Sequence, residues 1–216
     1  MSILPESLKL AACNLSSVEG KLLKEEQSLL EGATPTRQRE LIAGRHLARQ
    51  AMAELGCEPS PITQGPGGAA RWPRGICGSI SHSASHVAVA IGPASALRSV
   101  GVDIEDGRDL DSAIDMVGRQ DEIDGLAEHP LAGGRASAGR MLFSAKEALY
   151  KCQFPLTGNA TLDFLDIAVG MDVGGHLNAG LMQDQDALTR AIIPLVKILF
   201  VEIQSLTVAV AWIGTN

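Results

Sequence analysis

The sequence predicts an α+β fold, and three observations support this class. Each half of the 216-residue chain begins with apolar residues at a helical period and continues with the alternating pattern of strands. Hydrophobic residues make up 45% and charged residues 20%, a globular composition with enough apolar material for one large domain or two small ones. In addition, Val87–Gly92 is echoed by Val208–Gly214 with one insertion. This echo indicates either a duplicated fold or two independent strands with similar packing needs.

Two helices are expected near the start of the chain. Residues 16–32 open with the spacing of a capping box, and the leucines that follow recur at a helical period. Thr34 and the proline after it are typical of an N-cap and a first helical residue, so a longer helix is expected over residues 35–56. This helix carries Arg45 and Arg49, which are four residues apart and therefore lie on one face.

The chain then changes to strand patterns. Residues 59–78 are rich in proline and glycine and predict a long loop of the kind that often serves function. Alternating apolar residues predict two adjacent strands over 86–91 and 99–105, separated by a Gly-Pro turn.

The second half repeats this order. Residues 108–128 are acidic with a helical pattern, residues 130–138 are small and flexible, and residues 140–152 predict a clear amphipathic helix. The strand-like segments that follow are residues 162–169, 176–181, 195–203 and 207–213.

Composition and charge exclude several classes of function. Asp and Glu outnumber Lys and Arg by 25 to 18, and aromatic residues are 3%, which argues against nucleic-acid binding. No segment has the roughly 20 apolar residues of a membrane span, and the N-terminus lacks the pattern of a signal peptide. The four cysteines form no CxxC pair, which favours reduced thiols. We therefore expect a cytoplasmic protein without nucleic-acid or membrane partners, in which any anionic ligand binds a local basic pocket.

Two carboxylates lie at the end of a predicted strand. Asp103 and Glu105 are two residues apart, so their side chains project from one face with Cα atoms about 7 Å apart. Such a pair can share a hard cation such as Mg²⁺, which prefers oxygen ligands. The alternative is a solvated polar strand end.

A second charged set lies on the helix predicted over residues 140–152. Glu147 and Lys151 are four residues apart on one face, with Lys146 beside them. An ordinary surface ion pair is the alternative. If this face meets Asp103 and Glu105, however, a third carboxylate completes a metal site and a lysine answers phosphate charge.

Two other segments lack the motifs they suggest. Residues 78–86 contain serines beside histidines but no GxSxG nucleophile elbow, and His82 and His86 are about 13 Å apart if they lie in a strand, too far for one metal ion. Residues 65–68 are glycine-rich but lack the GK[ST] ending of a phosphate-binding loop.

Several blocks taken in order resemble the 4'-phosphopantetheinyl transferase superfamily. They are Arg45 in a helix, RWPRG at 71–75, SISHS at 79–83, GVDIE at 101–105 and FSAKEALYK at 143–151. The WPxG and SISHS blocks look like the branch that contains the surfactin-type enzyme and enterobactin synthase component D. The resemblance implies a pseudo-twofold, duplicated α+β monomer with coenzyme A bound between the halves. Residues 1–105 would bind coenzyme A phosphates, and residues 106–216 would carry the metal and the catalytic helix.

The resemblance also implies a reaction and its partners. The activity is that of a holo-[acyl-carrier-protein] synthase type enzyme: it transfers 4'-phosphopantetheine from coenzyme A to a serine of an apo carrier protein and releases adenosine 3',5'-bisphosphate. The cofactor is Mg²⁺ or Mn²⁺. The partners are acyl or peptidyl carrier protein domains of nonribosomal peptide, polyketide or fatty-acid synthases, including those of siderophore and other secondary-metabolite pathways.

Roles for individual residues follow from the same resemblance. The expected metal ligands are Asp103, Glu105 and Glu147. Glu147 is also the expected base for the acceptor serine, and Lys151 the residue that stabilises charge on the leaving group. The residues expected to bind coenzyme A are Arg45, Arg49, Arg74, Ser81, His82, Lys146 and Lys151. The residues expected to face the carrier protein are Met116, Leu126, Leu131, Arg135, Arg140 and Met141.

Two alternatives to the transferase stay open. One is a catalytically silent homologue that binds coenzyme A or a carrier protein, which the complete set of Asp103, Glu105, Glu147 and Lys151 disfavours. The other is a Mg²⁺-dependent phosphate-ester hydrolase that uses the same carboxylates and needs no acceptor protein.

Overall fold

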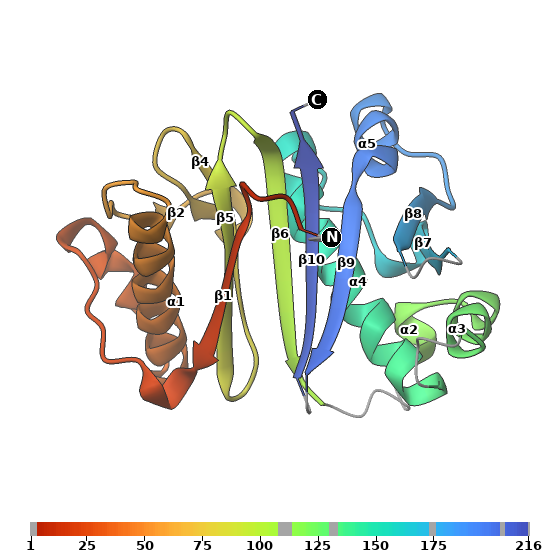
Figure 1. Cartoon of the computed structure of the whole chain (residues 1–216), viewed down its shortest axis with the longest axis horizontal. Coiled ribbons are helices and arrows are strands. Elements are labelled where there is room, and N and C mark those ends of the chain that lie inside the picture. Colours follow the sequence, from red (N-terminus) through yellow and green to blue (C-terminus); the bar gives the residue numbers. More distant parts are fainter. Residues whose placement is uncertain (1–3, 108–113, 130–133, 173–175, 204–205, 216) are drawn as a thin grey trace.

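The computed structural model describes residues 4–107, 114–129, 134–172, 176–203 and 206–215. Two larger sheets stand side by side, each with one long helix packed against it, and a third sheet has only two short strands (Figure 1). The predicted α+β class is confirmed. No helix within these ranges is long and apolar enough to cross a membrane.

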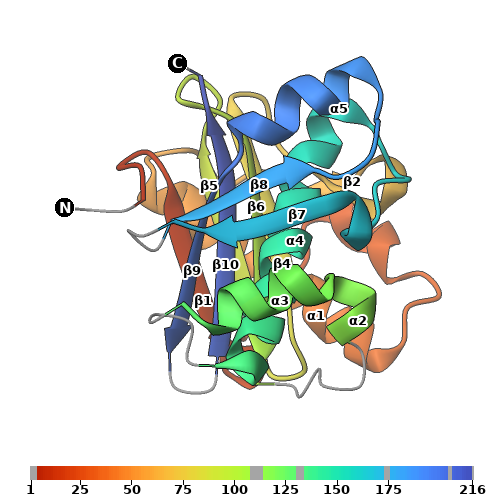
Figure 2. The same ribbon diagram turned by 90° about the vertical axis from the view of Figure 1, so that its right-hand side faces the viewer.

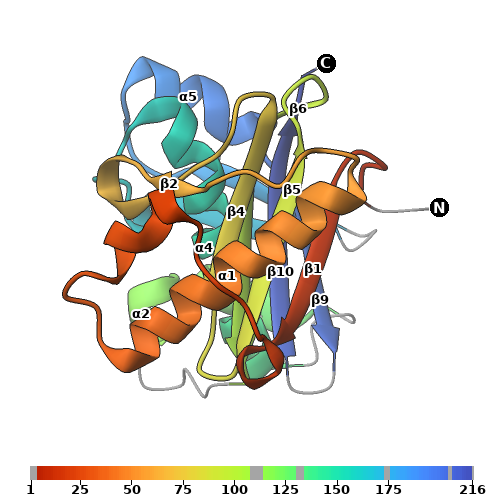
Figure 3. The ribbon, with the colours of Figure 1, turned by 90° about the vertical axis from the view of Figure 1, so that its left-hand side faces the viewer.

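The first sheet has three antiparallel strands in the order β1-β5-β4. They are β1 (Lys9–Asn14), β5 (His86–Pro93) and β4 (Ile76–His82). Helix α1 (Pro35–Glu54) lies across this sheet (Figure 3) and begins at the predicted threonine cap, whose hydroxyl accepts the backbone N–H of Arg37. The sequence analysis missed β1, which pairs with β5 along its whole length.

The second sheet has five strands in the order β6-β10-β9-β8-β7. They are β6 (Leu97–Asp106), β10 (Leu206–Gly214), β9 (Lys197–Ile203), β8 (Leu177–Leu181) and β7 (Ile167–Met171). Helix α4 (Arg135–Thr157) packs on this sheet. In Figure 2, β7 and β8 cross in front of α4. The predicted division of the chain at residue 105 stays a prediction, although β6 on its N-terminal side pairs with β10.

Shorter elements complete the fold. They are 3₁₀ segments η1 (Leu15–Ser17), η2 (Lys24–Leu30), η3 (Pro66–Gly68), η4 (Phe164–Asp166) and η5 (Ile193–Leu195), strands β2 (Thr63–Gln64) and β3 (Ala70–Arg71), and helices α2 (Ile114–Val117), α3 (Gln120–Ala127) and α5 (Ala187–Ile192). Helices α2 and α3 account for the described part of the acidic segment, whereas residues 108–113 and 130–133 lie outside the described ranges.

The helix predicted over residues 16–32 is wrong, because this segment forms only η1 and η2. The carboxylate of Glu26 is buried and accepts hydrogen bonds from the Leu23 and Ile62 amides, which ties the segment to a distant part of the chain. Gly20 packs so closely on the His46 ring that an added Cβ would lie 2.7 Å from it. Tertiary contacts therefore override the local helical pattern.

The side chains of strand β6 alternate between two faces, as predicted. Val100, Val102 and Ile104 join an apolar cluster with residues of β5 and β10. The opposite face meets α4, and a Cβ on Gly101 would lie 1.9 Å from the carbonyl oxygen of Ala148. This close approach brings the next side chain on that face, Asp103, next to α4.

Gly101→Ala is expected to destabilise the fold by about 3 kcal/mol or more, because overpacking against a helix backbone cannot be relieved by a rotamer change. Gly125→Ala in α3 is the matched control, since an added Cβ there meets nothing within 4 Å. Alanine favours a helix over glycine, so this control should be neutral or more stable. Urea denaturation measures both, and equal stability of the two variants would contradict the account.

Candidate functional site

A cluster of polar side chains joins β4, β6 and α4. The Lys151 ammonium donates to Asp103 Oδ1 at 2.6 Å and to Ser81 Oγ at 3.0 Å. The Ser81 hydroxyl donates to the same Asp103 oxygen at 2.9 Å. Glu147, one turn before Lys151, places its Oε2 3.6 Å from that ammonium. The structure thus brings together the acidic strand end and the charged helix face that the sequence singled out.

The electrostatics of this cluster depend on burial. The Asp103 side chain is 4% exposed, whereas Glu147 and Lys151 are 31% and 27% exposed. Burial raises the pKa of Glu147, the Lys151 ammonium opposes this rise, and the Asp103 charge adds to it. The Glu147 carboxylate is therefore a better proton acceptor than an ordinary surface glutamate.

The carboxylates of the cluster fit a hard cation. Asp103 Oδ2 is buried and, among the residues described, has no hydrogen-bond partner, so it is available as a ligand. Glu147 Oε2 lies 3.6 Å from the same Lys151 ammonium, and Glu105 is half-buried two residues beyond Asp103 on β6. No group of three His, Cys, Asp or Glu side chains in the described ranges is already gathered for metal binding. A cation here would share Asp103 and Glu147 with Lys151.

A cavity of about 550 Å³ opens beside this cluster and is called the first cavity. It lies between α1 and β4 on one side and α4 on the other. Its charged and titratable lining residues are Arg37, Glu40, Arg45, His82, Arg98, Glu147 and Lys151, and aromatic rings of Trp72, Tyr150 and Phe154 add apolar walls. Despite the acidic chain, this cavity is the local basic pocket expected for an anionic ligand.

Two predicted phosphate-binding residues lie on the wall of the first cavity. Arg45 is 6% exposed and its Nε donates to the Ile62 carbonyl at 2.7 Å. Burial lowers the pKa of Arg45, while Glu26 opposes this effect. His82 Nε2 is 2.6 Å from Arg37 Nη1, and burial lowers the pKa of this histidine. His82 Nε2 also lies 3.2 Å from Glu40 Oε2, and the Glu40 charge opposes the effect of burial on the histidine pKa.

Arg37 and Arg98 also line the first cavity, although the sequence analysis gave them no role. Arg37 is two helical steps of four residues before Arg45 on α1, so the pattern of arginines could have identified it. Arg98 is exposed at the start of β6, where no sequence signal distinguishes it from other surface cations.

A second cavity of about 290 Å³ lies on the other side of Glu147 and Tyr150, which line both cavities. Its other lining residues are Lys146, Ala160, Thr161, Leu162, Asp163, Phe164 and Ile167. Glu147 therefore lies where the basic first cavity meets a smaller one.

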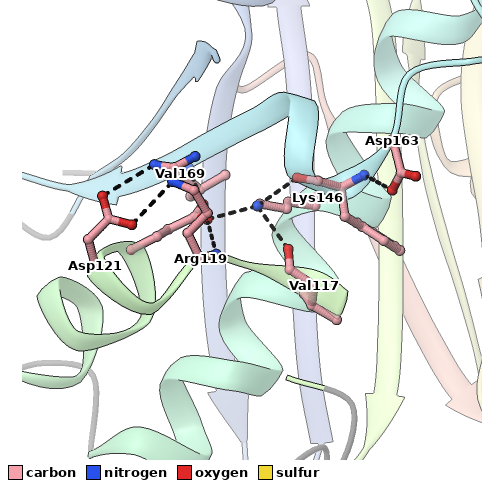
Figure 4. Close-up of polar contacts among 8 residues, drawn as sticks. Val117, Arg119, Asp121, Lys146, Asp163 and Val169 are labelled. Atoms are coloured by element: carbon pink, nitrogen blue, oxygen red, sulfur yellow. Dashed lines mark hydrogen bonds and ion pairs between the residues drawn. The ribbon is translucent and has the colours of Figure 1, made fainter. Parts of the chain in front are cut away.

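Lys146 lies in a buried network rather than in the charged cluster (Figure 4). Its side chain is fully buried, and its ammonium donates to Glu122 Oε2 at 3.0 Å and to the carbonyls of Val117 and Phe164. Burial lowers the pKa of Lys146, and the Glu122 carboxylate opposes this. Glu122 Oε1 also accepts the Val169 amide at 2.6 Å. The network fastens α2, α3, η4 and β7 to α4.

Three of the predicted coenzyme A residues, Ser81, Arg49 and Arg74, lie away from the lining of both cavities. Arg49 binds both carboxylate oxygens of Glu26, at 2.9 and 2.7 Å, and Arg74 is exposed before β4. The roles in coenzyme A binding stay predictions for all seven residues, Arg45, Arg49, Arg74, Ser81, His82, Lys146 and Lys151.

The predicted carrier surface is partly wrong. Leu126 and Met141 are each 1% exposed and belong to the core beneath α3 and α4, because each occupies the apolar face of its helix. Met116 is 68% exposed and Arg135 is an exposed partner of Asp124, so both can face solvent. Arg140 is half-buried, and Leu131 lies outside the described residues.

Comparisons with known proteins point to one family. Residues 25–92 match the family model for the 4'-phosphopantetheinyl transferase N-terminal domain, and residues 99–193 match the 4'-phosphopantetheinyl transferase superfamily. The chain is 36% identical to 4'-phosphopantetheinyl transferase Npt of Nocardia iowensis over 72% of this chain and 69% of that protein. It is 39% identical to 4'-phosphopantetheinyl transferase PptT of Mycobacterium tuberculosis over 62% of this chain and 59% of that protein.

A holo-(acyl-carrier-protein) synthase from Bacillus anthracis, in complex with CoA (3',5'-ADP), aligns with 56% of this chain and 99% of its own, at 18% identity and a TM-score of 0.39.

The raised pKa of Glu147 predicts a pH-dependent effect of Glu147→Gln. The folded protein keeps the Glu147 proton at pH values where the unfolded chain, with a pKa near 4.5, has lost it. This contribution to stability is complete below pH 4.5 and is lost as the pH rises through the folded pKa. In metal-free buffer the variant should therefore gain stability relative to the wild type as the pH rises from 4 to 7.5. Urea denaturation across this range checks it, and a constant difference would contradict the burial effect.

Proposed function

Since the chain belongs to the 4'-phosphopantetheinyl transferase superfamily, we propose that it transfers 4'-phosphopantetheine from coenzyme A to a serine of an apo carrier protein. The serine oxygen forms a bond to the β-phosphorus as the pyrophosphate P–O bond breaks, the serine proton passes to a base, and adenosine 3',5'-bisphosphate leaves. The observation that carries the proposal is the Lys151 ammonium between Asp103 and Glu147, beside a basic cavity.

Coenzyme A would lie along the two cavities. The guanidinium groups of Arg37 and Arg45 and the ring of His82 suit the phosphates at the nucleotide end, and planar guanidinium favours bidentate contacts with a phosphate monoester. The second cavity, with Leu162 and Phe164 in its wall, suits the less polar pantetheine arm. This placement would bring the pyrophosphate beside Glu147 and Lys151, where the two cavities meet.

The residues of the cluster divide the chemistry between them. Glu147 takes the proton of the acceptor serine, for which its raised pKa is suitable. Lys151 stabilises the negative charge that develops on the leaving phosphate. Asp103, Glu147 and Glu105 would hold Mg²⁺ or Mn²⁺, which neutralises pyrophosphate charge when bound. The Ser81 hydroxyl bonds both the Asp103 carboxylate and the Lys151 ammonium and so fixes their relative positions.

Finer features of the proposal have separate support. We place the chain in the surfactin-type and enterobactin synthase component D branch, with holo-[acyl-carrier-protein] synthase activity, on the WPxG and SISHS blocks. A monomer is proposed because α1, β4, β6 and α4 of one chain line the first cavity. A cytoplasmic location agrees with four free cysteines. The proposed partners are carrier domains of nonribosomal peptide, polyketide or fatty-acid synthases, including siderophore pathways.

Intact-protein mass spectrometry tests the proposal. Apo carrier proteins are incubated with the protein, coenzyme A and Mg²⁺, with and without a chelator. The expected result is a gain of one phosphopantetheine per carrier, lost when the chelator is present. Breakdown of coenzyme A without carrier modification would favour the hydrolase, and coenzyme A binding without turnover on any carrier would favour the silent homologue.

A further inference from the structure

Glu26 is a fully buried carboxylate on η2, outside both cavities. Arg49 binds its two oxygens at 2.9 and 2.7 Å, and this arginine also donates to the Lys21 carbonyl. The Leu23 amide donates to Glu26 Oε2 at 2.9 Å. These contacts fix the orientation of the carboxylate, because each oxygen accepts at least two hydrogen bonds.

The same carboxylate is connected to the first cavity through the backbone of Ile62, by its N–H on one side and its carbonyl on the other. Glu26 Oε1 accepts the Ile62 amide at 2.8 Å, and the Ile62 carbonyl accepts Arg45 Nε at 2.7 Å. Ile62 is fully buried at the end of the loop that leads from α1 to β2. The loop backbone is therefore held between Glu26 and Arg45.

This chain of contacts determines how Arg45 can meet a ligand. The Ile62 carbonyl takes the Nε donor, so the four N–H groups on the terminal nitrogens are the donors suited to a phosphate. A planar guanidinium fixed at Nε presents those groups in one direction. If the Ile62 carbonyl were displaced, the Arg45 guanidinium would keep its positive charge but lose its fixed orientation.

We propose that Glu26 is a positioning residue that orients Arg45 through Ile62 and thereby sets the preference of the protein for coenzyme A over dephospho-coenzyme A. The inference rests on the proposed function, in which Arg37, Arg45 and His82 bind the phosphates at the nucleotide end, and it assigns the 3'-phosphate monoester to Arg45. It assigns a specificity role to a residue that does not line the binding cavity.

The test measures dissociation constants for coenzyme A and dephospho-coenzyme A by calorimetry, so that it does not depend on transfer. Glu26→Asp keeps the charge that pairs with Arg49 but shortens the reach to Ile62, and Glu26→Gln removes the charge. Glu25→Gln is the matched control, since Glu25 is the neighbouring glutamate on η2 and is exposed. Each Glu26 variant should lower the preference for coenzyme A by about fivefold or more, because small misplacements of a binding group have large effects. Glu25→Gln should leave it unchanged.

A double-mutant cycle with Arg45→Ala separates positioning from a general loss of structure. In the Arg45→Ala background the Glu26 variants should cause no further loss of preference. Equal weakening of both ligands, or an undiminished Glu26 effect without Arg45, would overturn the inference. If Arg45→Ala reduces the preference and the Glu26 variants do not, the inference fails and the proposed function stands. An unchanged preference in Arg45→Ala alone would instead remove Arg45 from the proposed function.

The wild-type protein supplies a measurement that does not require a variant to fold. By ¹⁵N NMR, coenzyme A should shift the Arg45 Nε–H and Ile62 amide resonances more than dephospho-coenzyme A at saturation. Equal shifts with the two ligands would show that the Ile62 connection does not respond to the 3'-phosphate and would overturn the inference.

Discussion

The close packing of β6 on α4 is the constraint on which the candidate site depends. At Gly101 the strand backbone lies so near the Ala148 carbonyl that no Cβ fits between them. The period of the strand then places Asp103 toward the helix, and the period of the helix places Glu147 and Lys151 in one row. The result is an ammonium in contact with a buried carboxylate at 2.6 Å, made by residues far apart in the sequence.

Two buried ion pairs hold the segments around the two cavities in place. Glu122 with Lys146 fastens α3, η4 and β7 to α4 beneath the second cavity, and Glu26 with Arg49 fastens η2 and the α1–β2 loop beside the first. Loss of one partner from such a pair leaves an uncompensated buried charge, which typically costs about 3–5 kcal/mol. The first pair thus fixes the position of η4, whose Phe164 lines the second cavity. The second pair fixes Ile62, whose carbonyl accepts the Nε–H of the cavity-lining Arg45.

Much of the fold was predictable because its main elements carry strong local patterns. Helix α1 has a threonine cap and a helical period, and β5, β6 and β10 alternate in the expected way. The sequence analysis stated what would follow if Asp103 met the charged face of α4, but it could not predict that they meet. Nothing in the sequence of either segment specifies that β6 packs on α4. The predicted N-terminal helix failed because a distant contact, that of Glu26 with the Ile62 amide, decides how this segment folds. The predicted exposure of Met141 failed because this residue lies on the apolar face of α4, within the core. The spacing of the arginines on α1 indicates Arg37 and Arg49 alike, and only the contact of Arg49 with Glu26 accounts for its absence from the cavity lining.

The central claim is that Asp103 and Lys151 act as one unit in phosphopantetheine transfer, and a kinetic cycle tests it most directly. The rate of transfer to an apo carrier would be measured for Asp103→Asn, Lys151→Met and the double variant. Groups that act together show non-additive losses, so the double variant should be no slower than the slower single variant. If the two losses multiply, the residues contribute independently and the account of the site is contradicted.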